Sequence, residues 1–384
     1  MIPYGKQDIT QDDLNAVLEV LQSDFLTQGP AVPSFETEIS NYVGANHAVA
    51  CNSATSALHI ACLALGLGSG DLMWTSPISF VASANCGLYC GSSIDFVDIN
   101  PITFNICPDL LDTKLKSAKE NNSLPKILVL VHMAGHPSDL EKIYTLAKNY
   151  GVKIIEDASH AVGAKYKNTS IGSCAYSDVT IFSFHPVKII TTGEGGMALT
   201  NSNKVAEKMR LLRTHGITRE ESKMSKNDGP WYYQQIELGF NYRMTDIQAA
   251  LGISQFQRLE SYVEKRNEIA DFYHQELSHL PLKTPKIQDN AYSSYHLYIV
   301  RLDLNNLSSS HHDIFTDLRD SGIGVNLHYI PIHLHPYYKN LGFQEGDFPN
   351  AEDFYKEAIS LPLFPTISDQ SLAEVVNQLT KILK

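Results

Sequence analysis

Short apolar segments alternate with helical patterns between residues 47 and 200, and this alternation constrains the fold more than any other feature. The apolar segments are rich in Val and Ile, as the buried strands of a mostly parallel sheet are. A helical pattern over 139–151 lies between two of them and forms a β-α-β unit. We therefore predict a large α/β domain. Its predicted strands are 47–52, 71–76, 93–99, 126–132, 152–157, 178–184 and 196–200.

Helical patterns lie on both sides of this region. Thr10 followed by Asp13 resembles a capping box at the start of a helix. A second helix near 35–43 ends at Gly44, because glycine favours the end of a helix. Residues 245–280 contain few helix breakers and predict a long helical stretch.

The C-terminal part predicts a smaller α+β domain. A chain of 384 residues with 43% hydrophobic composition is long enough for two cores. We predict a large domain at 1–255, including an N-terminal arm, and a small domain at 256–384, with the boundary inside helical sequence. The predicted elements of the small domain are strands 294–302 and 324–330 and helices 313–322 and 371–384.

Composition excludes several classes of protein. The net charge of -12 disfavours a nucleic-acid partner, because phosphate backbones attract basic surfaces. No apolar run approaches the roughly 20 residues of a membrane helix, and the N-terminus lacks the pattern of a secretory signal. The six cysteines are scattered, which indicates reduced thiols in a cytoplasmic protein.

The segment 183–196 contains a lysine directly after a predicted strand, on a loop with three glycines. Lysine forms a Schiff base with a carbonyl cofactor when its surroundings lower its pKa. Glycines allow the backbone to bend tightly around such a group. Lys188 is therefore a candidate carrier of a cofactor, with an ordinary lysine in a surface turn as the alternative.

Asp157 and His160 follow the predicted strand 152–157. Ligands of open α/β sheets bind at the carboxyl ends of the strands. A carboxylate at this place keeps a pyridine nitrogen protonated and strengthens the ring as an electron sink. Asp157 suits that role, although a helix cap is the alternative. His160 is a candidate partner of the cofactor's phenolic oxygen or a neighbour of its ring, and a buried structural histidine is the alternative.

Two further strand ends complete a candidate site for pyridoxal phosphate (PLP). Near residue 52 a strand gives way to small hydroxyl residues and a helix, whose free N–H groups attract phosphate. Ala54 and Thr55 are candidate phosphate ligands there, together with the hydroxyl of Ser183. Phe80, after another strand, is a candidate for stacking on the ring. Helix capping and core packing are the respective alternatives, but the order of all these residues favours one PLP site.

Five motifs resemble the DegT/DnrJ/EryC1/StrS sugar aminotransferase family, in the order that the family has them. The resemblance implies a PLP-dependent transferase of fold type I, with PLP covalently held by Lys188 and an aminated form, pyridoxamine phosphate (PMP), between half-reactions. It also implies that Asp157 pairs with the pyridine nitrogen and that Ser183, Ala54 and Thr55 hold the phosphate. Asn241 would reach the cofactor of a neighbouring subunit, which implies a homodimer with shared sites. The motifs are NSATSAL, EDASHA, SFHPVK, TTGEGG and GFNYRMTDIQAALG.

Other segments resemble the branch of the family that acts in pseudaminic acid biosynthesis, notably MIPYGKQDIT, SDFLTQGP and VNLHYIPIHLHPYY. That resemblance implies L-glutamate as amino donor and a UDP-linked 4-keto-6-deoxy N-acetyl sugar as acceptor. The residues that match the lining of its sugar-nucleotide pocket are Tyr4, Asp24, Phe25, Leu26, Thr27, Asn326, Leu327, His328 and Tyr329.

Several alternatives stay open at this stage. Related PLP-dependent dehydratases have histidine where this chain has Lys188, so the lysine favours transamination. Another GDP- or dTDP-linked 4-keto sugar is an alternative acceptor. A non-enzymatic binding protein of the same fold would be expected to lack Lys188 or Asp157. A zinc site at His328, His333 and His335 lacks a fourth ligand nearby, so we predict no metal.

Overall fold

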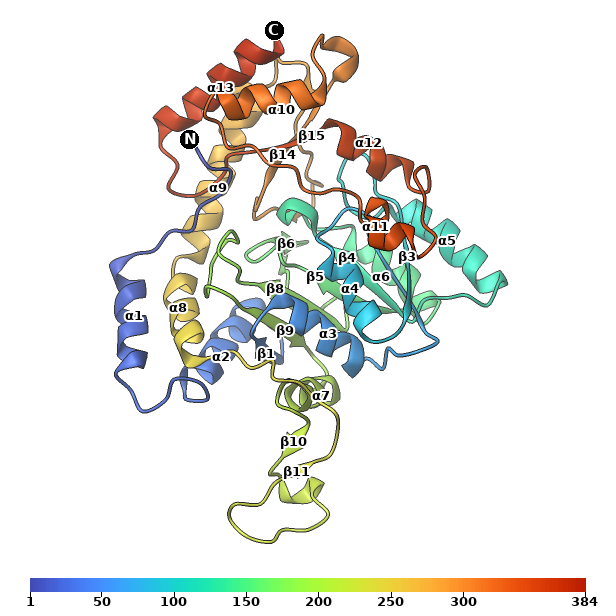
Figure 1. Ribbon diagram of the computed structural model, residues 1–384, viewed down its shortest axis with the longest axis vertical. Coiled ribbons are helices and arrows are strands. Elements are labelled where there is room, and N and C mark those ends of the chain that lie inside the picture. Colours follow the sequence, from blue (N-terminus) through green and yellow to red (C-terminus); the bar gives the residue numbers. More distant parts are fainter.

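A computed structural model describes all residues, 1–384, and contains a seven-stranded sheet at its centre (Figure 1). Every strand predicted between residues 47 and 200 is present in this sheet. In their order across the sheet, the strands are β1 (His47–Cys51), β9 (Gly196–Thr200), β8 (Val179–Ser183), β5 (Lys153–Asp157), β4 (Ile127–Val131), β2 (Leu72–Thr75) and β3 (Ser93–Phe96).

Helices cover both faces of the sheet. Alternate residues of each strand point to opposite faces, so Ile154 packs in one apolar core and Ile155 in the other. One core contains α2 (Ala31–Val43), α5 (Pro108–Glu120), α6 (Leu140–Asn149) and α8 (Asp246–Phe256). The other contains α3 (Ala54–Ala64), α4 (Ala82–Tyr89) and α7 (Asn203–Arg213). Both faces are therefore buried, as expected for a mostly parallel sheet.

The pairing of the strands places the candidate residues at one edge of the sheet. Strands β2, β3, β4, β5 and β8 are parallel, whereas β9 is antiparallel to both of its neighbours, β1 and β8. The carboxyl ends of β1, β5 and β8 therefore share an edge with the first residue of β9. Cys51, Asp157, Ser183 and Gly196 lie along this edge.

A smaller unit follows the long helix α9 (Leu259–Glu276). The start of α9 packs in the core of the large sheet, while Ile269 and Tyr273 pack in a third apolar core. The predicted boundary at residue 255 stays a prediction and falls just before α8 ends. The smaller unit contains β12 (Leu282–Lys283), β14 (Tyr298–Leu302), β15 (Ala358–Leu361), α10 (His311–Asp320), α11 (Pro336–Lys339), α12 (Pro349–Glu357) and α13 (Asp369–Leu383).

The predicted strand over 324–330 is wrong. Asn326 makes a single bridge to Ser360, and the chain then leaves the sheet. Beyond this bridge side chains rather than the backbone make the contacts: the ring of His328 bonds the hydroxyl of Ser360, and the hydroxyl of Tyr329 bonds His160 in the cavity. The sheet instead uses β15, which pairs with β14 and was not predicted.

Several short elements lie outside these layers. The predicted capping box is confirmed at the start of α1 (Gln11–Leu21), and Gly44 caps α2 in a left-handed conformation. A small sheet joins β13 (Ala291–Tyr292), β6 (Lys165–Tyr166) and β7 (Thr169–Ser170). The pair β10 (Ile217–Thr218) and β11 (Gln234–Gln235) lies in an arm that projects from the body at the foot of Figure 1. None of the helices is long and apolar enough to span a membrane.

Candidate active site

A cavity of about 630 Å³ opens at the edge of the sheet where the strand ends meet. Residues from the large sheet, from the N-terminal segment and from the 326–329 turn line it together. Residues far apart in sequence thus converge on one space large enough for a cofactor and a substrate. The predicted site residues that line it are Tyr4, Ala54, Thr55, Phe80, Asp157, His160, Ser183, Lys188, His328 and Tyr329.

The start of α3 forms one end of the cavity. Ser53 caps the helix by accepting the backbone N–H of Ser56 at 3.1 Å, which leaves Ala54 and Thr55 in the first turn. The helix start lies against β9, since a Cβ on Gly196 would stand 2.4 Å from the nitrogen of Ala54. Glycine at this position is therefore what allows the helix terminus to lie at the strand edge, where free N–H groups attract a phosphate.

Asp157 lies deeper in the cavity with its carboxylate held on both sides. One oxygen accepts the hydroxyl of Ser83 on α4 at 2.6 Å. The other accepts the backbone N–H of Ser159 at 3.2 Å and its hydroxyl at 2.6 Å. These bonds fix the plane of the carboxylate, so that it can meet a ring nitrogen in a defined orientation.

Lys188 lies opposite, after β8, and is half-buried. Withdrawal from water lowers the pKa of its amine to about 8, while the negative charge of Asp157 acts in the raising direction. A substantial fraction of neutral amine is therefore present near neutral pH. Neutral amine is the form that attacks a carbonyl.

Two pocket residues, Tyr329 and His160, carry a hydroxyl and an imidazole that contact each other. The hydroxyl of Tyr329 lies 3.1 Å from Nε2 of His160, and the two rings are stacked with centroids 6.1 Å apart. Burial, together with the charge of Lys188, holds the pKa of His160 well below its ordinary value. Burial first, and Asp157 second, raises the pKa of Tyr329. Both groups are therefore uncharged at neutral pH.

The remaining predicted rings also line the cavity. Tyr4 packs against His328 with ring centroids 5.3 Å apart. Burial lowers the pKa of His328 to about 3, with Lys188 adding to the effect. Phe80 is 59% exposed, and its ring lies 6.3 Å from that of Tyr329.

The predicted residues outside the cavity are the 24–27 loop, Asn241, Asn326 and Leu327. The carbonyl of Leu26 accepts the first N–H of α8, so the loop lies at the start of that helix. Thr27 lines a separate cavity of about 150 Å³ with Arg243. Asn241 is exposed, and its carbonyl accepts the side chain of Asn52, which does line the main cavity.

Sequence reasoning missed several residues of the cavity, chiefly Asn52, Ser159, His185, Glu194 and His296. Four of them, all except His296, lie within motifs that already indicated a cofactor site. The motifs are NSATSAL, EDASHA, SFHPVK and TTGEGG. His296 precedes β14 of the smaller unit, and only the tertiary fold brings it to Lys188. Two histidines of the alternative zinc site bond different residues instead of facing a common centre. His333 bonds Glu352, and His328 bonds Ser360.

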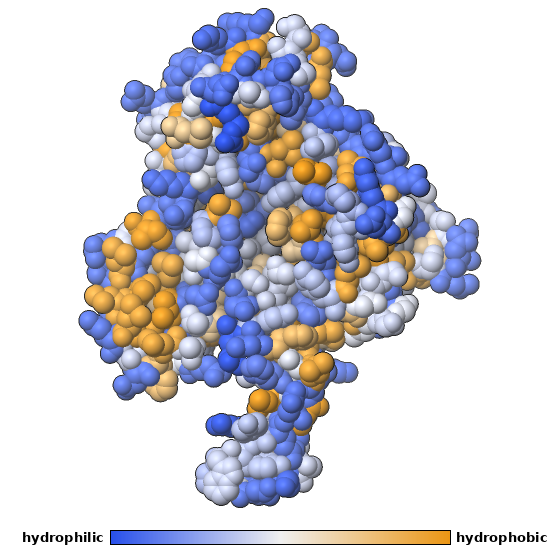
Figure 2. All heavy atoms as spheres, in the orientation of Figure 1, coloured by the Kyte–Doolittle hydropathy of each residue, from blue (hydrophilic) through white to orange (hydrophobic).

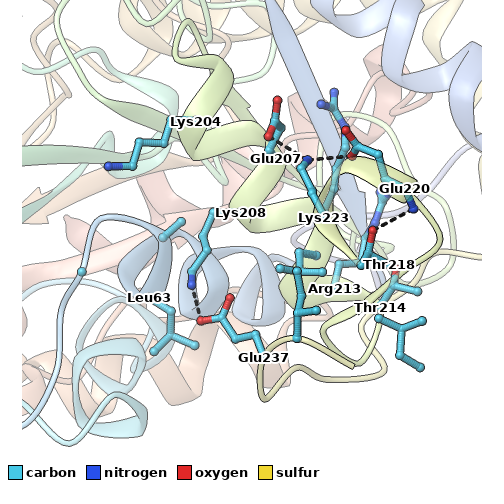
Figure 3. A pocket seen from close by; sticks show the side chains of 16 residues that line it. Leu63, Lys204, Glu207, Lys208, Arg213, Thr214, Thr218, Glu220, Lys223 and Glu237 are labelled. Carbon is cyan, nitrogen blue, oxygen red and sulfur yellow. Dashed lines mark hydrogen bonds and ion pairs between the residues drawn. The ribbon is translucent and has the colours of Figure 1, made fainter. Parts of the chain in front are cut away.

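A larger groove of about 770 Å³ lies elsewhere, between the end of α3, α7 and the base of the arm (Figure 3). Two of its lysines are matched by carboxylates. Lys208 pairs with Glu237, and Lys223 lies 3.0 Å from Glu207 and 2.7 Å from Glu220. None of the predicted site residues lines this groove.

The arrangement in the main cavity fits PLP. A helix terminus and the hydroxyl of Ser183 lie where a phosphate would be held, Asp157 offers a fixed carboxylate, and Lys188 offers an amine.

The sequence matches the DegT/DnrJ/EryC1/StrS aminotransferase family over residues 7–380. The chain belongs to this family. The predicted aminotransferase activity class and the family assignment are thereby confirmed, and the alternative of a non-enzymatic protein is set aside.

Individual relatives of this aminotransferase cover almost its entire length. It is 38% identical over 385 residues to the UDP-4-amino-4,6-dideoxy-N-acetyl-beta-L-altrosamine transaminase of Campylobacter jejuni, covering 100% of this chain and 98% of that one. The structure of Helicobacter pylori PseC, an aminotransferase involved in the biosynthesis of pseudoaminic acid, matches with a TM-score of 0.91 at 32% identity, over 100% and 99% of the two chains.

A third match bears on the cofactor. The PLP form of the putative sugar aminotransferase Spr1654 from Streptococcus pneumoniae matches with a TM-score of 0.88 at 29% identity, over 100% of both chains. Likeness to PLP aminotransferases along the whole chain confirms the predicted α/β fold of a PLP-dependent transferase. PLP is accordingly the cofactor that the family and this likeness imply.

Proposed function

We propose that this aminotransferase moves the amino group of L-glutamate to C4 of a UDP-linked 4-keto-6-deoxy N-acetyl sugar, with PLP held covalently by Lys188. The observation that carries the proposal is the meeting of Lys188 and Asp157 in one cavity with the start of α3. Bound PLP supplies an electron sink for the carbanion that forms when the donor's α-proton leaves.

Each residue of the chain has a defined task in this proposal. Once the donor's amine has replaced it on the cofactor, the freed amine of Lys188, with its lowered pKa, would take up the proton from the donor's α-carbon. Asp157 keeps the pyridine nitrogen protonated, and Ser83 and Ser159 hold its carboxylate for that purpose. Ser183, Ala54 and Thr55 hold the phosphate. Phe80 and His160 orient the ring, and the hydroxyl of Tyr329 holds His160.

The acceptor assignment is supported by the printed activity of the Campylobacter jejuni relative and the pathway of PseC. It is also supported by Tyr4, His328 and Tyr329, which line the same cavity as Lys188. In this proposal the segments 24–27 and 326–329, of which only His328 and Tyr329 line this chain's cavity, bind the nucleotide sugar. A GDP- or dTDP-linked 4-keto sugar is the competing acceptor that the experiment below includes.

We further propose a homodimer in which each subunit completes the site of the other. Asn241 is exposed beside the cavity and would reach the partner's cofactor. Apolar side chains of α1 are exposed, and Figure 2 shows them as a hydrophobic area on the left of the molecule. Such an area is larger than single scattered residues would make and suits a subunit interface. We also propose a cytoplasmic location and the domain division at residue 255.

An absorbance titration tests the proposed function. The purified holoenzyme is expected to show a visible band that L-glutamate bleaches and that the UDP-linked 4-keto-6-deoxy N-acetyl sugar restores. The GDP- and dTDP-linked 4-keto sugars, added separately, serve as matched controls and should restore the band poorly. If a GDP- or dTDP-linked sugar restored the band and the UDP-linked sugar did not, the UDP assignment would be contradicted. No band after addition of PLP would contradict the whole proposal.

A further inference from the structure

We infer that His296 is a binding residue for the α-carboxylate of the amino donor. The inference rests on the proposed function, because it assigns a role within the same cavity. His296 lies directly before β14 and belongs to none of the family motifs found in the sequence. It nevertheless lines the cavity beside Lys188 and His160.

The need for such a residue follows from the charges of the cavity. The donor brings a carboxylate directly next to the amino group that reacts. Among the residues lining the cavity there is no arginine, and Lys188 is the one lysine. Lys188 is committed to the cofactor and to proton transfer. Another group must therefore donate a hydrogen bond to the donor's carboxylate.

The nitrogens of His296 indicate how it can donate. Its ring makes no hydrogen bond within the chain, and Nδ1 is buried without a partner. The ring can therefore reach the cavity only through its Nε2 edge. A buried N–H without an acceptor is rarer in proteins than an unsatisfied acceptor, so we assign the proton to Nε2. His296 then presents the N–H of Nε2 to the cavity, while Nδ1 is buried away from it.

The surroundings of His296 favour an anion. Arg266 is only 2% exposed, and its guanidinium bonds the carbonyls of Tyr295, His296 and Leu363, each at 3.2 Å, but no carboxylate. A buried cation without a counter-ion leaves a positive potential around it. Burial, His160, Lys188 and this guanidinium hold the pKa of His296 well below its ordinary value. The imidazole is thus neutral, in a field that attracts negative charge.

The position of His296 is fixed from behind. Its ring centroid lies 4.4 Å from that of His160. Both segments pack closely on Gly135, where a Cβ would stand 2.8 Å from the carbonyl of His160 and 3.0 Å from the nitrogen of His296. A side chain at this position would separate the two histidines. An imidazole that served only to fill space here would be expected to give way to an apolar side chain, because burying its unpaired nitrogen is unfavourable.

The test measures the L-glutamate concentration that half-bleaches the visible band of the holoenzyme. His296→Phe keeps the ring and removes the donor, so this concentration should rise on the order of 10-fold. The band position and PLP affinity should not change. His296→Gln places an N–H near the position of Nε2 and should stay within about 3-fold of wild type, whereas His296→Asn, too short, should resemble His296→Phe.

His136→Phe is the matched control. His136 is a buried histidine with an unpartnered Nε2 in the same neighbourhood, but it lies outside the cavity. Its loss should change thermal stability and leave the half-bleaching concentration unaltered. Unchanged glutamate dependence in both His296→Phe and His296→Asn would overturn the inference. A shifted band or lost PLP binding in these variants would also overturn it, since His296 would then act on the cofactor. Failure of the proposed function looks different, because the wild-type band itself would be absent or would not respond to L-glutamate.

Discussion

The inner and outer parts of the candidate site differ in how the chain holds them. The inner part, Ala54, Asp157, Ser183 and Lys188, lies at the ends of adjacent strands and meets in one cavity. The outer part includes the 24–27 loop and Asn241, which lie on the surface outside that cavity. The sheet thus brings the inner residues together within one chain. In the proposed homodimer, a second copy of the chain is the surface on which the outer residues act.

The largest expected effect is at Lys188. Lys188→Ala removes the amine that carries the cofactor and moves the proton, so turnover should fall by more than about 10³-fold. The fold should persist, because the side chain makes no hydrogen bond or ion pair that holds other elements together. A coupled assay for 2-oxoglutarate measures the loss, and circular dichroism checks the fold. If the Lys188→Ala variant turned over near the wild-type rate, another residue would have to carry the cofactor and move the proton.

Asp157→Asn should have the next largest effect. The amide keeps the size of the side chain but removes the charge that protonates the pyridine nitrogen, so kcat should fall about 100-fold or more. Ser83→Ala is the matched control, because it removes one bond to the same carboxylate while the charge stays. Its kcat should fall much less. Equal losses in the two variants would mean that Asp157 acts through its hydrogen bonds rather than its charge.

Mixing subunits tests whether the outer residues act on the site of a second chain. Asn241→Ala alone should weaken PLP binding about 10-fold, since one charge-assisted hydrogen bond is lost. Inactive Lys188→Ala chains are refolded together with Asn241→Ala chains. Half of the dimers are then mixed, and each mixed dimer contains one intact site. About a quarter of the wild-type activity should then appear at a limiting PLP concentration. Activity no greater than the mean of the two parents would show that each site belongs to one chain.

The smallest expected effect concerns pH. Because the pKa of Lys188 is lowered to about 8, its neutral fraction rises through that pH, and the rate of PLP attachment to the cofactor-free enzyme should rise with it. The rate should level off above about pH 8 rather than near pH 10. Asp157 acts to raise this pKa, so Asp157→Asn should move the midpoint to lower pH. A stopped-flow absorbance series measures both midpoints, and an upward shift in the variant would contradict the electrostatic account.

The inner part could be predicted from sequence because the position of each residue depends on the strand that directly precedes it. Each candidate follows a Val- and Ile-rich strand, and the carboxyl ends of parallel strands meet at one edge. The outer part depends on tertiary contacts instead. In the smaller unit the predicted strand 294–302 and the predicted helices 313–322 and 371–384 are confirmed as β14, α10 and α13. The 324–330 segment has strand composition, yet Tyr329 turns to His160 and His328 to Ser360. His296 lay in a predicted strand, and no pattern around it indicates that it faces Lys188. The packing on Gly135 and Arg266 that places it is distant in sequence.

Chemical trapping identifies the lysine that carries the cofactor. The holoenzyme is reduced with borohydride, which fixes the cofactor on the lysine that carries it, and is then digested and examined by peptide mass spectrometry. The account predicts that the peptide containing Lys188 gains the mass of reduced PLP and that Lys188→Ala protein gains none. A modified peptide that contains another lysine, or an unmodified Lys188 peptide in protein whose visible band has disappeared on reduction, would contradict it.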